Sequence, residues 1–170
     1  MSSPNDISQT NVAQCAYFAG FIDGDGMVAI HKKKPPAYYT LQVNAVNTCR
    51  EPLDLLCQFF GGGVKVPYYQ HSPKYRPVWV WSVHAKKAES CLHQLLPFLV
   101  IKKVRAELAL LFRSTFGGDQ ALTRGNGISS DKNQRILADR HACYVLMRDL
   151  NRKGTGDTLS STSPEKFHAC

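Results

Sequence analysis

Two carboxylates, Asp23 and Asp25, stand between glycines in the sequence IDGDG of residues 22–26. Small and apolar residues in a helical pattern precede them, and residues that alternate as in a β-strand follow them, so the acids lie where a helix ends. A helix C-terminus carries a partial negative charge of about half an electron, which disfavours an acidic side chain by about 0.3–1 kcal/mol. A cation bound at this junction would reverse that unfavourable interaction.

A divalent metal ion is the cation that best explains the pair. Mg²⁺ takes few carboxylates, keeps several waters and accepts a phosphate oxygen, and the carbonyls of a helix's last turn lack intrahelical partners. Residues two apart on a helix cannot aim at one ion. We therefore expect a chain break at Gly24, with Asp25 beyond it as the metal ligand and Asp23 as local support.

Other known sites that acidic, glycine-rich or Cys/His motifs form do not fit this sequence. Met27 occupies the place of the next ligand of an EF-hand loop. The segments FGGGV and GGDQALTRGNG lack the GK[ST] of a phosphate loop and the strand-GxGxxG-helix order of a dinucleotide site. The spacing of CLH (91–93) and HAC (141–143) matches no standard zinc motif, so ordinary helix positions are the better interpretation.

The elements that must position the two acids form one α+β domain. We expect a helix over 11–24, strands over 26–33 and 39–47, a helix over 50–60, strands over 64–70 and about 76–84, and then helices, the last from about 131. This order, αββαββα with further helices, predicts helices on one face of an antiparallel sheet. The apolar positions expected to pack in the later helices are Ala88, Cys91, Leu92, Leu95, Leu99, Val104, Leu108, Leu111, Phe112, Cys143, Leu146, Met147 and Leu150.

Composition suggests a nucleic-acid partner. The chain has 170 residues and a formal net charge of +8, and no apolar run is long enough to span a bilayer. A basic domain without a membrane-type amphipathic helix points to a polyanion such as nucleic acid. The 6 cysteines are scattered without a CxxC, which is typical of reduced thiols in an intracellular protein.

One face of the predicted sheet carries basic, amide and aromatic side chains that suit DNA. Such groups bond phosphates and the edges of guanine and adenine. A solvated polar face is the alternative for any one residue, but together with the charge a sheet surface in a DNA groove is the sharper hypothesis. The residues expected on or near it are Ala29, His31, Lys33, Gln42, Asn44, Lys65, Tyr68, Tyr69, Gln70 and Arg76.

The first helix has a stripe of small residues at every fourth position, namely Ala16, Gly20 and Gly24. Another backbone can approach such a stripe closely. From the spacing alone, packing against this chain's own sheet is about as good an explanation.

Residues 18–26, FAGFIDGDG, resemble the signature of the LAGLIDADG homing endonucleases. The context is similar as well, because the element order, the helix closing in FFGGGV (59–64) and the segment LLPFLVIKK (95–103) resemble the family pattern. The resemblance covers about residues 12–116. The positions that match the signature are Ala19, Gly20, Ile22, Asp23, Asp25 and Gly26.

This resemblance implies roles for individual residues. The acid at Asp25 and the carbonyl at Gly24 would bind the metal, which is Mg²⁺ or another divalent cation. Lys102 falls on the family's active-site lysine, and Asn47 on a water-orienting residue at the end of the second strand. The resemblance also implies that the signature helices of two copies pack together, through Ala16, Ala19, Gly20 and Asp23. Arg152 and Lys153, in the segment LNRKG, are further expected DNA contacts.

Only one signature is present, so the resemblance implies a homodimer on a near-palindromic double-stranded DNA target. The expected activity is metal-dependent hydrolysis that breaks both strands and promotes intron homing. An RNA-binding maturase that acts on its host intron RNA is the alternative on the same fold. We expect no membrane association, and a location with the encoding genome: chloroplast or mitochondrion in a eukaryote, otherwise cytoplasm. Residues 1–10 are expected to be a flexible N-terminus, 11–150 the single domain and 151–170 a basic, then polar, mobile tail.

Overall fold

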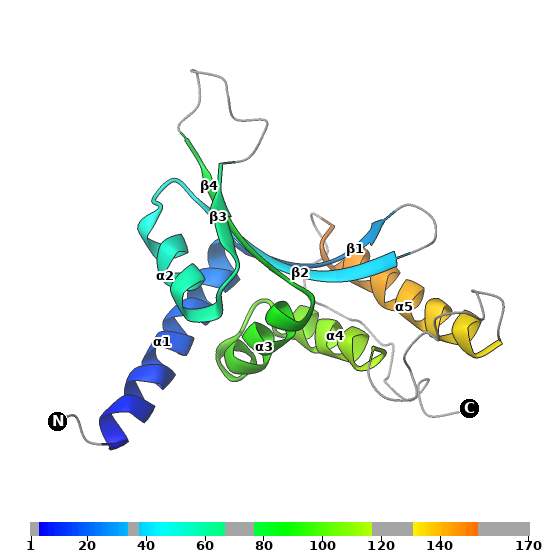
Figure 1. Cartoon of the computed structure of the whole chain (residues 1–170), viewed down its shortest axis with the longest axis horizontal. Coiled ribbons are helices and arrows are strands. Elements are labelled where there is room, and N and C mark those ends of the chain that lie inside the picture. Colours follow the sequence, from blue (N-terminus) through cyan, green and yellow to red (C-terminus); the bar gives the residue numbers. More distant parts are fainter. Residues whose placement is uncertain (1–3, 34–37, 67–76, 117–130, 153–170) are drawn as a thin grey trace.

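The computed structural model describes residues 4–33, 38–66, 77–116 and 131–152, and the side chains within these ranges except those of residues 4–10 and Lys33. The chain forms an α+β fold, and the predicted αββαββα order is confirmed (Figure 1). The elements are α1 (Pro4–Asp25), β1 (Gly26–Lys33), β2 (Tyr38–Asn47), α2 (Glu51–Phe60), β3 (Gly63–Lys65), β4 (Trp79–His84), α3 (Ala85–Leu95), the 3-10 turn η1 (Leu96–Phe98), α4 (Lys103–Ser114) and α5 (Asp131–Leu150).

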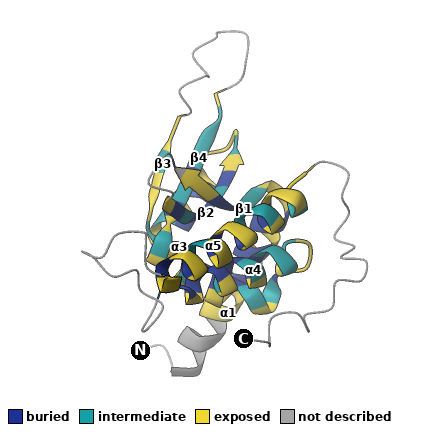
Figure 2. Cartoon of the chain, turned by 90° about the vertical axis from the view of Figure 1, so that its right-hand side faces the viewer, coloured by how far each residue is buried: buried dark blue, intermediate teal, exposed yellow. Residues whose placement is uncertain are grey.

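The four described strands form one antiparallel sheet in the order β1-β2-β4-β3. All the helices lie on one side of this twisted sheet, with α1 and α2 at one end and α5 beside β1 at the other (Figure 1). Figure 2 shows α3, α4 and α5 gathered beneath the sheet, with exposed residues turned away from it. The predicted arrangement of helices on one face is therefore confirmed.

The alternation of side chains decides which sheet face is buried, because successive residues of a strand point to opposite faces. On the helix side the strands contribute the core residues Val28, Ile30, Leu41, Val43, Ala45, Trp81 and Val83, all nearly inaccessible to solvent. Trp81 also donates its indole N–H to the Gly61 carbonyl at 2.8 Å, which satisfies the one polar atom of its ring. The opposite face, called here the outer face, carries the intervening residues.

The structure corrects several predicted boundaries. The first helix begins at Pro4, since proline's fixed φ and missing N–H suit a first turn. It also continues through Gly24 to Asp25, because Gly24 is not among the positive-φ glycines of the described residues. Strand β3 ends at Lys65, since its partner β4 begins only at Trp79.

Two helices bury different residues from those predicted. In α4 the buried apolar residues are Ala106, Ala109 and Phe112, whereas Leu111 is exposed. In α5, Cys143 and Met147 are buried as predicted, but Leu146 is exposed. Periodicity alone favours the bulkiest apolar residues, whereas in α4 two small alanines fill buried positions beside Phe112 and Leu111 lies outside the buried side.

The turn between α2 and β3 yields a stability prediction. Gly62 has a φ of +91°, and a Cβ there would meet the Ser82 carbonyl oxygen and lie 2.6 Å from Val83 Cγ1. We expect Gly62→Ala to lower the free energy of unfolding by about 2–4 kcal/mol, measured by urea denaturation. Gly63→Ala is the matched control, because a Cβ at Gly63 meets no atom within 4 Å. Equal stability of the two variants would contradict this role for Gly62.

Candidate metal and nucleic-acid site

The junction between α1 and β1 delivers Asp25 to the surface. Helix α1 ends at Asp25 and β1 starts at the next residue, Gly26, without a connecting loop. A Cβ on Gly26 would lie 2.6 Å from the Ile22 carbonyl oxygen, so only glycine permits the strand to leave the helix this abruptly. Asp25 is consequently exposed at the end of the helix, next to the sheet.

Asp23 has a different environment, although it is only two residues away. It is 9% exposed, and its carboxylate accepts three backbone N–H bonds from the segment before α4. Asp23 Oδ2 accepts from Val100 at 2.7 Å and Ile101 at 3.1 Å, and Oδ1 accepts from Lys102 at 2.8 Å. The acid therefore fastens the end of α1 to the start of α4, as the support role predicts.

The same connection positions the Lys102 side chain. Its ammonium group donates to the backbone carbonyl oxygen of Asp23, in the last turn of α1. A helix C-terminus is the favourable end for a cation. The structure thus places Lys102 against the turn that ends in Asp25, so the three residues Asp23, Asp25 and Lys102 belong to one small region.

Asn47, the last residue of β2, contacts Asp25 directly. Its amide oxygen accepts the Cys49 backbone N–H at 2.8 Å, which directs the amide nitrogen the other way. That nitrogen donates to Asp25 Oδ2 at 2.7 Å. The structure therefore brings the predicted pair Asp25 and Asn47 together, and the loop backbone sets the orientation of the amide.

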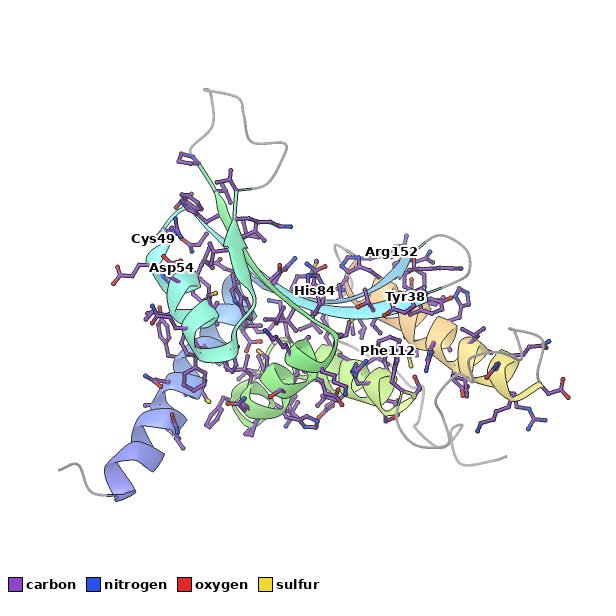
Figure 3. The ribbon with its side chains drawn as sticks, in the orientation of Figure 1. Tyr38, Cys49, Asp54, His84, Phe112 and Arg152 are labelled. Atoms are coloured by element: carbon purple, nitrogen blue, oxygen red, sulfur yellow. The ribbon has the colours of Figure 1, made fainter. Side chains whose placement is uncertain are left out.

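Arg50 is a cation of this region that the sequence analysis did not single out. It follows the loop from Asn47, and its guanidinium lies 4.8 Å from the Trp79 ring centroid while Nε donates to Asp54 Oδ2 at 3.0 Å. Figure 3 shows Cys49 and Asp54 together at the α2 end of the molecule. The available signal in the sequence was a basic residue in the short loop between β2 and α2.

The donors at this junction suit an ion that takes few protein ligands. Within the described ranges, no three His, Cys, Asp or Glu side chains gather closely enough to form a metal cage. Burial raises the pKa of the Cys91 and Cys143 thiols, so they stay protonated and make poor ligands. The exposed Asp25 carboxylate and the last-turn carbonyls, Gly24 included, are oxygen donors that fit Mg²⁺ completed by waters and phosphate.

The outer face carries the predicted DNA-contact residues of β1, β2 and β3 in register. Directly paired residues share a face, which gives rows across the strands. These rows are His31 with Thr40; Ala29 with Gln42 and His84; Met27 with Asn44 and Ser82; and Val46 with Val80 and Lys65. His31, His84 and Lys65 are exposed, and Gln42 and Asn44 are half-buried.

Ala29, one of the predicted DNA contacts, offers DNA little surface. It lies on the outer face but is only 7% exposed, because its methyl group is shorter than the side chains around it. Lys33 pairs with Tyr38 on the outer face by register, but its side chain lies outside the described residues. Tyr68, Tyr69, Gln70, Arg76 and Lys153 lie outside them as well.

Arg152 is exposed just after the end of α5, and its position is fixed by two anchors. Arg105 Nη2 donates to the Leu150 carbonyl at 2.7 Å, and Asn151 Nδ2 donates to the Val28 carbonyl of β1 at 3.0 Å. In Figure 3 the labels of Arg152 and Tyr38 both lie on the side of the molecule opposite Cys49.

The four residues of α1 predicted to contact a second copy lie on two sides of the helix. Ala16 and Gly20 are exposed, and a Cβ on Gly20 or Gly24 would meet no atom within 4 Å. Ala19 is 0% exposed and Asp23 is turned inward, so the prediction that these two residues contact a second copy is wrong. Both share the inward side of α1 with the buried Cys15, Phe18 and Ile22.

Solved structures resemble this fold over most of the chain. The homing endonuclease I-CvuI, solved with its DNA target and calcium, matches with a TM-score of 0.67 and 17% identity over 85% of this chain and 87% of its own. The archaeal intron-encoded homing endonuclease I-Vdi141I, complexed with DNA, gives 0.59 and 15% identity over the same shares. The LAGLIDADG homing endonuclease I-GzeII, also with a DNA target, gives 0.61 and 14% over 90% of this chain and 56% of its own.

The chain has the LAGLIDADG homing endonuclease fold. No protein-family model matches the sequence, and the comparison with curated proteins gives no match. The fold predicted from FAGFIDGDG is thereby confirmed by structures that share little sequence with this chain. Within this LAGLIDADG fold, the junction of α1 and β1 holds the exposed acid Asp25. None of the described helices combines the length and apolar composition needed to cross a membrane.

Proposed function

We propose that this chain is a site-specific DNA endonuclease that makes a double-strand break in a long, near-palindromic target and so promotes homing of its intron. The observation that carries this proposal is the exposed Asp25 carboxylate, oriented by Asn47 at 2.7 Å, beside the outer face of the sheet. The fold, the net charge of +8 and the DNA complexes of the structural neighbours support the same conclusion.

The chain's own residues divide the work of binding and hydrolysis. The outer face lies in the DNA groove, where Lys65, His31 and His84 approach phosphates and base edges. Asp25 and the Gly24 carbonyl are the groups that would hold a divalent ion, Mg²⁺ or a substitute. Asn47 keeps the Asp25 carboxylate in one orientation, and Lys102 adds positive charge near the leaving oxygen. When bound, the ion supplies Lewis-acid stabilisation and a water of lowered pKa.

A double-strand break needs two hydrolytic sites, and this chain carries one signature, so we propose a homodimer. The exposed stripe of Ala16 and Gly20, with Gly24 below it, is the contact surface on α1. The small residues let the two helices approach closely, which brings the two Asp25 residues to the centre of the dimer.

The homodimer yields a prediction at Gly20. Gly20 is exposed and a Cβ there meets no atom within 4 Å, so Gly20→Leu should leave the fold intact and even favour α1 by about 0.8 kcal/mol. The same side chain blocks a close partner helix, so we expect a monomer in sedimentation and loss of double-strand cleavage. Ala138→Leu, at an exposed residue of α5, is the matched control and should stay dimeric. A dimeric Gly20→Leu protein would contradict this interface.

A maturase that binds host intron RNA is not favoured by any contact in the described residues. The exposed acid, the oriented amide and the nearby lysine are the parts that hydrolysis requires, whereas RNA binding alone requires none of them. The endonuclease would act in the compartment that contains the genome encoding it.

The test uses purified protein and a duplex in which the DNA flanking its reading frame is joined without the intron. We expect a double-strand break in Mg²⁺ and none in excess EDTA. Folded protein that binds this duplex but never cuts it, with any of Mg²⁺, Mn²⁺ or Ca²⁺ present, would overturn the proposal.

A further inference from the structure

One row of the outer face holds two valines side by side, next to a lysine. In this row Val46 of β2 pairs with Val80 of β4, and Val80 pairs with Lys65 of β3. Val46 is 38% exposed, and Val80 is half-buried beside it. Both valines point away from the core that Ala45 and Trp81 occupy on the other face. We call Val46 and Val80 the valine pair.

The valine pair lies at the end of the sheet where the candidate metal ligand is. Val46 is followed directly by Asn47, whose amide bonds Asp25 at 2.7 Å. Among the rows of the outer face, the row of the valine pair is therefore next to the acid. The row of His31 and Thr40 is six residues further along β2, roughly 20 Å away at about 3.3 Å per residue.

The rows differ in what they can recognise in a major groove. Asn44 and Gln42 lie in the next two rows, further from Asp25. Their side-chain amides match the donor and acceptor pair of adenine. The valine pair has no hydrogen-bonding group, and the apolar group that the major groove offers is the C5-methyl of thymine. Lys65, in the same row, supplies the charge that holds the DNA backbone over it.

We propose that the valine pair contacts the C5-methyl group of a thymine next to the cut, so that this protein selects its target by a methyl group at that position. This inference rests on the proposed endonuclease function and adds the chemical group that is recognised near the scissile phosphate. Single exposed valines are common on strands. Here, however, two lie side by side on a charged DNA-facing surface, at its catalytic end.

Replacement of thymine by uracil tests this directly, because it removes only the methyl group. Targets are selected for cleavage from a randomised duplex library made with thymine and from a second library made with uracil. We expect thymine to be enriched near the cut in the first library and uracil not to be enriched in the second. On a fixed target, the same replacement should lower affinity in EDTA, and cleavage in Mg²⁺ at subsaturating protein, about 3–10-fold next to the cut.

Protein variants locate the effect. In Val46→Ser and Val80→Ser proteins, the ratio of cleavage of the thymine target to cleavage of the uracil target should be close to one when the replacement is next to the cut. Asn44→Ser, a substitution in the neighbouring row, should keep that ratio. It should instead change the base preference at target positions further from the cut. Lys65→Ala should weaken binding to all sequences and reduce the salt dependence, with the ratio unchanged.

The outcomes separate the two proposals. Wild-type protein that cuts thymine and uracil targets equally well overturns the methyl contact and leaves the endonuclease intact. Folded protein that cuts no member of either library overturns both. If a serine variant fails to fold, the comparison of the two DNAs with wild-type protein still decides the question.

Discussion

Replacing Asp25 with asparagine should lower the rate of DNA cleavage by roughly 10³-fold or more, with target affinity in EDTA nearly unchanged. The asparagine has the same shape, but it lacks the charge that would hold a divalent ion at the end of α1. Its effect on stability should be small, because Asp25 is exposed and, among the described residues, its side chain is held by the hydrogen bond from Asn47. Single-turnover cleavage in Mg²⁺ measures the rate, and gel-shift titration measures the affinity.

Asp139→Asn is the matched control, because Asp139 is also an exposed acid but lies on α5. It should cut at the wild-type rate, which excludes a general effect of lost negative charge. An Asp25→Asn protein that cuts as fast as wild type would remove the residue on which the proposed mechanism depends.

Replacing Asp23 with asparagine should have the opposite profile. We expect its free energy of unfolding to fall by about 2–4 kcal/mol, because charge-assisted bonds from three N–H groups are weakened and the amide N–H₂ faces other donors. Urea denaturation at one fixed protein concentration measures this, since dimer stability depends on concentration. The region around Lys102 should also lose protection from hydrogen exchange.

Asp25→Asn serves as the control for this second variant, because it should unfold within about 1 kcal/mol of wild type. Substitution of Asp23 is thus expected to affect stability, and substitution of Asp25 is expected to affect cleavage. An Asp23→Asn protein with wild-type stability but no cleavage would instead place Asp23 in the reaction.

The spacing predicted that the two acids would differ, whereas the choice of Asp25 as the ligand rested on a chain break at Gly24 that α1 does not have. Residues two apart on a helix point in different directions, so Asp23 and Asp25 had to differ. The burial of Asp23 and the exposure of Asp25 agree with that argument. The partners of Asp23 lie 77–79 positions away in the chain, and only the fold brings the segment of Val100 to Lys102 to this carboxylate.

Other features depend on neighbours that periodicity does not reveal. Ala29 lies on the outer face that is proposed to contact DNA, but its short side chain leaves it buried. Ala19 belongs to the small-residue signature, yet it packs within its own chain, while Gly20 next to it is open. The anchoring of α5 by Asn151 on the Val28 carbonyl had no sequence signal, because it joins residues 123 positions apart.

Mixed dimers test the central claim most directly, namely that each chain uses its own Asp25 to cut one strand. Wild-type and Asp25→Asn chains, one with an affinity tag, are produced together, and dimers with one chain of each kind are isolated and added to a supercoiled plasmid that carries the target. We predict nicked circles as the main product in Mg²⁺, whereas wild-type dimers give linear DNA. Linear DNA formed by the mixed dimers at the wild-type rate would contradict the account.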